Sequence, residues 1–180
     1  MNKIFKVASV AIIALVANSA FAQTDDTTLK VNVAAVYSIV VTDPEVTIDM
    51  DEADHFVNGN SSDEQAGHIE VTATDAYTVT VSSAATLVGE AEAEEISAGT
   101  VVVTAEDGTY LGNGADGGST ADFSEAQLGD TDGSLLITGS GGDLRSFNVT
   151  YTIPAASAQA YINVPVDTYT TVVTYTIAAE

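Results

Sequence analysis

The sequence predicts an all-β protein, built as a sandwich or a barrel of short strands. Three observations support this prediction. Apolar residues recur at every second position in several segments, which is the period of a strand with one buried face. These segments are rich in Val, Thr and Tyr, and clusters of Gly, Asp, Asn and Ser separate them. No segment sustains the 3.6-residue apolar period of an amphipathic helix.

The first four predicted strands lie between residues 29 and 105. Residues 29–41 form the first, with alternating positions at Leu29, Val31, Val33, Ala35, Tyr37, Ile39 and Val41. Residues 69–73 and 77–81 form the next two, and the three residues between them are expected to make a turn or a bulge. A short strand follows at residues 99–105, bounded by turn residues.

Three more strands complete the predicted set. They are residues 133–139, residues 145–154, which close at Pro154, and residues 169–177. The last two each present one apolar face, made of Phe147, Val149, Tyr151 and Ile153 in one and Tyr169, Thr171, Val173, Tyr175 and Ile177 in the other. Between the strands we expect an acidic loop at residues 43–67, a Gly-rich loop at 107–122 and an acidic surface loop, rather than a helical turn, at 90–99.

The amino-terminal residues have the pattern of a secretory signal peptide. Lys3 and Lys6 give a positive start, "VASVAIIALVA" is apolar, and Ala20 and Ala22 form an A-x-A cleavage site. The pattern predicts export through the Sec pathway to the periplasm, the cell surface or the medium. Removal of residues 1–22 leaves residues 23–180 as one domain, with no apolar run long enough for membrane insertion.

The rest of the chain is strongly acidic. Without the two signal-peptide lysines, Lys30 and Arg145 are the cations that remain against 26 acids, a formal charge of 2 − 26 = −24. Such a surface repels nucleic acid and anionic lipid headgroups. Two explanations of the acidity stay open: adaptation to a saline habitat, where ions screen the repulsion, and binding of divalent cations.

Two acidic runs supply weak candidates for a metal site. "DPEVTIDMDEAD" and "DTDG" place carboxylate oxygens in loops, which suits Ca²⁺, so the candidate ligands are Asp49, Asp51, Asp54, Asp130 and Asp132. Neither run keeps the spacing of an EF-hand, and a solvated acidic loop is the interpretation that we favour for both. His55 and His68 lie in or beside the first of these loops and allow a His/carboxylate site without specifying one.

No motif in the sequence indicates an enzyme. There is no G-x-S-x-G elbow and no Cys, and a Ser-His-Asp triad has no local signature here. "GNGADG" satisfies G-x-G-x-x-G, but the dinucleotide fingerprint requires a βαβ unit that this chain does not predict. We therefore predict no catalytic residue and no cofactor, with Ca²⁺ binding as the open alternative.

The carboxy-terminal segments resemble a group of secreted proteins. "VPVDTYTTVVTYTI" is similar to the P-x-G-x-Y-x-x-x-V-x-V-T-V ending of secreted bacterial β-sandwich proteins of the spore coat U-like and fimbria-like type, including a related exported domain family of unknown function. "FNVTYTIPAASA" resembles the strand and loop that precede it. Asp167 stands where the family has Gly, and "TIAAE" lacks the penultimate aromatic residue of chaperone-recognised subunits. The resemblance implies a single immunoglobulin-like, Greek-key sandwich of about seven to nine strands, with no catalytic residues to carry over.

Two classes of function are expected. The first is a non-enzymatic structural subunit of a surface coat, fimbria or matrix, which associates with its own copies or with other surface subunits by strand addition. The candidate donor strand begins directly after the cleavage site, at residues 23–33 of the segment "QTDDTTLKVNVAAV", and the alternative is an ordinary first strand of the same domain. The second class is an adhesin-like or calcium-dependent binding module that uses residues 43–67.

Overall fold

The computed structural model describes residues 25–113 and 118–180. Residue contacts divide the chain after Asn32, and within the described ranges every helix and strand belongs to the unit that begins at Val33. The expected signal peptide, residues 1–22, lies outside the described residues. No helix in the described ranges is long and apolar enough to cross a membrane.

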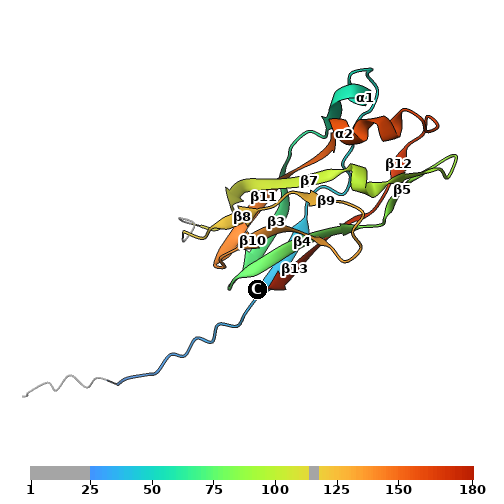
Figure 1. Ribbon diagram of the computed structural model, residues 1–180. Coiled ribbons are helices and arrows are strands. Elements are labelled where there is room, and N and C mark those ends of the chain that lie inside the picture. The colour runs from blue at the N-terminus through green and yellow to red at the C-terminus, as the bar shows by residue number, and fades with distance from the viewer. Residues whose placement is uncertain (1–24, 114–117) are drawn as a thin grey trace, which may run out of the picture. The chain divides into compact units, whose positions relative to one another are not determined.

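The larger sheet is antiparallel throughout and is built around the longest strand of the chain (Figure 1). Its order is β1-β3-β11-β7-β9, and β2 pairs with the far end of β11. The bounds are β1 Tyr37–Val41, β2 Gly59–Ser61, β3 Gln65–Ala73, β7 Val102–Tyr110, β9 Ala126–Gln127 and β11 Asp143–Pro154.

Two smaller sheets accompany it. The second sheet has the order β13-β4-β10-β8, with β4 Tyr77–Ser83, β8 Ala121–Phe123, β10 Ser134–Gly139 and β13 Val173–Ala179. The third has the order β12-β5-β6, with β5 Thr86–Gly89, β6 Glu95–Ser97 and β12 Tyr169–Thr170. The helical pieces are short: α1 His55–Asn58, η1 Ala98–Thr100, α2 Ala155–Ala158 and η2 Gln159–Tyr161.

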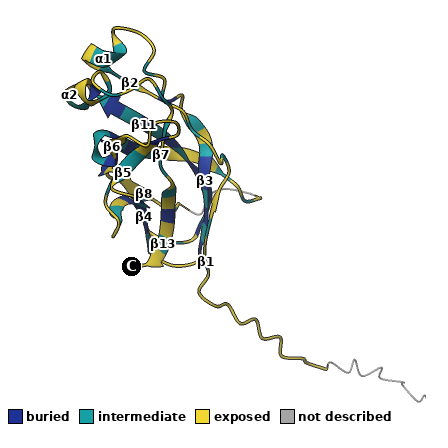
Figure 2. Cartoon of the chain, turned by 90° about the vertical axis from the view of Figure 1, so that its right-hand side faces the viewer, coloured by how far each residue is buried: buried dark blue, intermediate teal, exposed yellow. Residues whose placement is uncertain are grey.

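The core lies between the first two sheets and consists of the inward faces of their strands (Figure 2). Ile69 and Val71 from β3 pack with Tyr77, Val79 and Val81 from β4, all of them fully or almost fully buried. The predicted inward face of β11 is buried as well: Phe147, Val149, Tyr151 and Ile153. The all-β sandwich is therefore confirmed. In the described residues eight strands have four residues or more, which agrees with the seven to nine expected.

A bulge in β10 changes which of its side chains are buried. The register between β10 and β4 shifts between Leu135 and Ile137, so that Leu136 and Ile137 are both fully buried although they are consecutive. An extra residue in one strand breaks the in-out alternation at that point. The strand was predicted from its turn residues, but this local exception to the alternation was not.

Three predicted strands differ from the structure. Residues 99–105 were expected to be a short strand, whereas Ala98–Thr100 form η1 and β7 runs from Val102 to Tyr110, into the expected Gly-rich loop. Residues 29–41 were expected to be one strand, whereas β1 begins only at Tyr37 and residues 29–36 belong to no strand. Residues 169–177 were expected to be continuous, whereas β12 pairs with β5 and β13 pairs with β4. Thr171 and Val172 join these two short ladders, because the segment passes from the third sheet to the second.

The connection at residues 74–76 joins the two main sheets. β3 and β4 are consecutive in sequence, yet β3 lies in the larger sheet and β4 in the second. The turn is held by a hydrogen bond from the Ala76 N–H to Asp75 Oδ1, at 2.9 Å, and by one from the Thr74 N–H to the Val36 carbonyl, at 3.0 Å. This connection places the inward faces of two adjacent predicted strands opposite each other.

Candidate functional site

A groove of about 930 Å³, lined by both apolar and polar side chains, lies beside β13, between residues 41–50 and residues 161–175. Strands of both main sheets and their flanking segments contribute its buried lining: His68, Val101, Leu128, Tyr151, Ile153 and Tyr175. Half-buried apolar side chains, including Val46 and Val173, also line it. The groove is therefore apolar in its depth and open to solvent along its rim.

One wall of the groove is an extended segment that has no strand partner. Residues 43–50 follow β1, and Val46, Ile48 and Met50 are half-buried while the residues between them are exposed, which is the alternation of a strand. Within the described part of the chain no ladder pairs with this segment. The one hydrogen bond to its backbone there comes from Asn60 Nδ2 to the Asp49 carbonyl, at 2.7 Å. The segment thus presents unpaired N–H and C=O groups, which is what an incoming strand needs.

The opposite wall contains a second unpaired edge. β13 forms its ladder with β4 on one side. It also lies close to β1, but no ladder joins those two strands in the described residues. Residues 43–50 follow β1 and residues 171–172 precede β13. Both segments line the groove. The groove therefore lies where the two main sheets end without being joined.

His68 is buried at the base of the groove and connects its walls. The ring is 2% exposed; its Nδ1 is 3.6 Å from Asp43 Oδ2, and its Nε2 is 3.2 Å from the Tyr151 hydroxyl. The Tyr151 hydroxyl makes a short hydrogen bond to the Tyr175 hydroxyl. The imidazole also stands edge-on to the rings of Tyr151 and Tyr175. These contacts form a chain from the unpaired wall, through the larger sheet, to β13.

Burial controls the pKa values of His68, Tyr151 and Tyr175 in this series of contacts. Burial lowers the pKa of His68 below its ordinary value of 6.5, and the Asp43 carboxylate opposes part of that shift. Burial also raises the pKa of Tyr151 and Tyr175, so both phenols stay protonated at neutral pH. No Ser hydroxyl contacts the His68 ring, whose partners among the described residues are phenols and one carboxylate. A triad with a serine nucleophile is thus not formed at His68.

The rim of the groove carries negative charge. Its lining includes five carboxylates and no Lys or Arg: Asp43, Glu45, Asp49, Glu90 and Asp167. Of the two cations after residue 22, Arg145 is buried among its own partners and Lys30 lies in an exposed segment. The electrostatics of the rim therefore favour a ligand that is neutral or positively charged.

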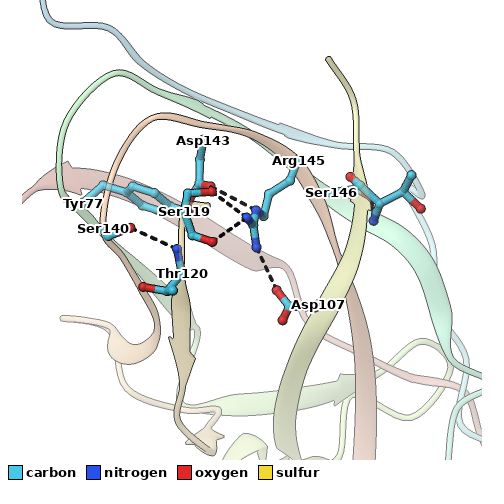
Figure 3. Close-up of polar contacts among 9 residues, drawn as sticks. Tyr77, Asp107, Ser119, Thr120, Ser140, Asp143, Arg145 and Ser146 are labelled. Carbon is cyan, nitrogen blue, oxygen red and sulfur yellow. Dashed lines mark hydrogen bonds and ion pairs between the residues drawn. The ribbon is translucent and has the colours of Figure 1, made fainter. Parts of the chain in front are cut away.

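A second polar cluster, centred on Arg145, lies at the junction of β4, β7 and β11 (Figure 3). The buried Asp143 carboxylate accepts hydrogen bonds from the Tyr77 hydroxyl, at 2.6 Å, and from Ser119. Arg145 Nε is 3.0 Å from Asp143 Oδ1, and its Nη1 donates to Asp107 Oδ1 at 3.0 Å. Burial and the neighbouring Asp143 raise the pKa of Tyr77 far above its ordinary range, so its hydroxyl acts as a donor.

The Arg145 cluster has the properties of a structural tie. One guanidinium faces two carboxylates, so the cluster offers no spare positive charge to an anion, and the adjoining cavity of about 190 Å³ is small. It connects three strands with the segment at Ser119, through a hydrogen bond from Arg145 Nη2 to the Ser119 carbonyl at 2.9 Å. A buried charge needs such partners, since an unpaired one costs several kcal/mol.

The structure does not bring the metal candidates together. Among the described residues, no three His, Asp or Glu side chains are grouped in a way that could hold a metal ion. Asp51 lies 3.2 Å from His55 Nδ1, Asp54 accepts a hydrogen bond from Asn58, and Asp130 accepts one from the Asp132 N–H. The Asp49 carboxylate has no hydrogen bond to a described residue, and its carbonyl accepts the one from Asn60. These contacts are local, and they explain the acidic residues as loop-stabilising and solvated groups.

Asp167 has clear structural partners in the turn between β5 and β6. Its Oδ2 accepts the backbone N–H groups of Ala91, at 2.8 Å, and of Glu92, at 3.2 Å, so it closes the turn between β5 and β6. These hydrogen bonds lower the pKa of the Asp167 carboxyl, with the Ala91 bond as the largest cause. Gly89 makes room for it, because a Cβ there would lie 2.6 Å from the same oxygen. The acidic loop expected at residues 90–99 is thus partly a hairpin turn held by Asp167.

Sequence reasoning missed both clusters, although one signal was present. Arg145 shares the alternating positions of Phe147, Val149 and Tyr151, which marks it as an inward-facing residue. A single inward-facing Arg requires acidic partners: Asp143 lies two residues earlier on the same face of β11, whereas only the fold brings Asp107 to it. His68 was noted as a possible ligand and is a buried hydrogen-bonded residue instead. Only the first two residues of the G-x-G-x-x-G segment, Gly112 and Asn113, are described, since residues 114–117 lie outside the described ranges.

No protein-family model matches the chain, and no curated protein is significantly similar to it in sequence.

Proposed function

We propose that the protein is a non-enzymatic, exported structural subunit of a surface coat, fimbria or matrix, and that its copies associate by strand addition. The observation that carries the proposal is the groove: two unpaired backbone edges flank an apolar channel that ends in the core. A strand placed between these edges would find hydrogen-bond partners on both sides and pockets for alternate side chains.

The donor that we propose is the segment around residues 29–36 of a second copy. This segment is in no strand, and its alternate apolar side chains are exposed: Leu29 by 84%, Val31 by 76% and Val33 by 82%. Burying a Val or Leu side chain is worth about 1.5–3 kcal/mol relative to leaving it in water. Three such side chains therefore supply a substantial driving force for insertion in an apolar groove.

Charge complementarity supports the same donor. Lys30 lies between Leu29 and Val31, so in an inserted strand it points away from the groove floor and toward the rim. Five carboxylates line the groove. Lys30 is the exposed cation of the chain after residue 22, whereas Arg145 is buried and paired. The segment thus combines the apolar period and the positive charge that the groove favours.

The test compares substitutions by Asp on the two faces of the donor strand: two on the face toward the groove and one on the opposite face. We expect Val31→Asp and Val33→Asp to abolish association of the chain 23–180 in sedimentation velocity, because each places a carboxylate on the groove face of the inserted strand. Asn32→Asp adds the same charge on the opposite face and should associate more strongly than either variant. All three monomers should melt as the wild type does, since residues 29–33 belong to no strand.

Two results would reject the proposal. One is association of Val31→Asp and Val33→Asp at wild-type strength. The other is a wild-type chain that stays monomeric at every concentration tested, because strand addition between copies must depend on concentration.

A further inference from the structure

The inference concerns His68, and it rests on the proposed strand addition. His68 is the one buried histidine of the chain; His55 is more exposed and pairs with Asp51 at the surface. The His68 ring lines the groove and touches groups from three separate elements. These titratable groups are Asp43 from the unpaired wall, Tyr151 from β11 and Tyr175 from β13. Any occupant of the groove would lie against this ring.

With His68 neutral, the hydrogen bonds of the chain can all run in one direction. We assign the ring proton to Nδ1, because that nitrogen faces the Asp43 carboxylate, which can only accept. Nε2 then accepts from the Tyr151 hydroxyl, and Tyr151 accepts from Tyr175. Nε2 and both phenols then have compatible hydrogen-bond partners, whereas Nδ1 lies 3.6 Å from Asp43 Oδ2, beyond hydrogen-bond distance.

A second proton on His68 disrupts this chain. Nε2 becomes a donor, so Tyr151 must turn its own proton toward Tyr175. The Tyr175 hydroxyl then has no acceptor for its proton among the described residues. Tyr175 is only 8% exposed, so the hydroxyl is buried without an acceptor. A buried donor without an acceptor costs about 1–3 kcal/mol. Protonation thus weakens the contacts that join β11 and β13 at the base of the groove.

An inserted strand would make the same proton still less favourable. In the open groove, water reaches the mouth, and the 45% exposed Asp43 carboxylate is screened by solvent. A strand across the groove excludes that water, which raises the cost of a charge on His68. The other carboxylates of the rim, Glu45, Asp49, Glu90 and Asp167, line the groove without a recorded contact to the ring. Binding of the strand and binding of the proton are linked. If the bound strand lowers the proton affinity of His68, then protonation of His68 lowers the affinity for the strand by the same factor.

We propose that His68 is a proton-operated release for the strand that occupies the groove: the strand stays bound while His68 is neutral and leaves when His68 becomes charged. Assembly would then respond to the pH outside the cell. The direction is opposite to that expected from the acidic surface, because neutralising carboxylates at low pH reduces repulsion and favours association.

The experiment follows association of the chain 23–180 between about pH 7.5 and pH 5.5, on either side of the ordinary histidine pKa. Sedimentation velocity is run at one ionic strength for the wild type, His68→Gln and His55→Gln. We expect the wild-type dissociation constant to rise as the pH falls, by up to about tenfold per pH unit. Tenfold is the largest change that the uptake of one proton can give. His55→Gln is the matched control and should keep this pH dependence. His68→Gln should lose it.

A second measurement uses the unmodified groove and does not depend on how His68→Gln folds. The two histidine ring signals are titrated by NMR in the assembled wild type and in monomeric Val33→Asp. We expect the pKa of His68 to be lower in the assembly and that of His55 to be the same in both.

The outcomes separate the two proposals. The proton-operated release is overturned, and strand addition stands, in either of two cases. In the first, assembly has the same pH dependence in His68→Gln as in the wild type. In the second, the pKa of His68 is equal in monomer and assembly. A wild type that is monomeric at both pH values overturns strand addition, and the release with it.

Discussion

Replacing Tyr77 by Phe should destabilise the sandwich through the loss of one hydrogen bond. The Tyr77 side chain is fully buried, and its hydroxyl donates at 2.6 Å to an Asp143 carboxylate that is also fully buried. Phe keeps the ring and its packing in the core. Asp143 retains Ser119 and Arg145 as partners, so its carboxylate loses one hydrogen bond and stays paired.

The magnitude follows from the charge on the acceptor. A hydrogen bond to a charged group contributes about 1.5–3 kcal/mol to stability. For a domain of this size, 1 kcal/mol corresponds to about 2–4 °C in melting temperature, so we expect Tyr77→Phe to lower Tm by about 3–12 °C. Calorimetry gives Tm, and urea denaturation gives the free energy of unfolding with its m-value.

Two controls make the result specific. Tyr37→Phe removes a hydroxyl that has no hydrogen bond to a described residue, and should change stability by less than about 0.5 kcal/mol. A double-mutant cycle of Tyr77→Phe with Asp143→Asn should give a coupling energy of about 0.5–3 kcal/mol, because the two groups are in direct contact. A Tyr77→Phe protein as stable as Tyr37→Phe would refute the reasoning, since the buried bond would then contribute nothing.

Two further predictions concern the loops. The pKa of Asp167 is lowered by the backbone N–H groups that it accepts, so the ionised form stabilises the fold above the ordinary Asp pKa near 3.8, and that contribution is lost as the pH falls through the lower folded-state value. Asp167→Asn should therefore flatten the acid limb of stability against pH, and an unchanged limb would remove the role assigned to Asp167. For calcium, we expect the same Tm in CaCl₂ as in NaCl of equal ionic strength; a calcium-specific rise would restore the candidate ligands, Asp49, Asp51, Asp54, Asp130 and Asp132.

Much of the fold was accessible from the alternation of apolar residues. The pattern assigned the correct buried face to β11 and to β4. It could not detect the bulge in β10, because Leu135, Leu136 and Ile137 are all apolar and fit either face. The extra residue is set by the pairing with β4, which is a long-range contact.

The same alternation gave the wrong extent for residues 29–36. These residues have the period of a strand, yet the described chain supplies them with no ladder, and β1 starts at Tyr37. Alternation reports that a segment can pair with a sheet, and it contains no information on which chain provides the sheet. For that reason the sequence left an intradomain strand and a donor strand both open.

The sequence by itself determined the strand faces, the acidic charge and the absence of thiol chemistry, because each depends only on local order or on composition. The tertiary structure decided the groove, the buried environment of His68 and the charge cluster around Arg145. Tyr77 and Asp143 are 66 positions apart, and His68 and Tyr151 are 83 apart. Residues at such separations meet only after the sheets have formed and packed, so their burial and their partners are properties of the fold and not of any segment.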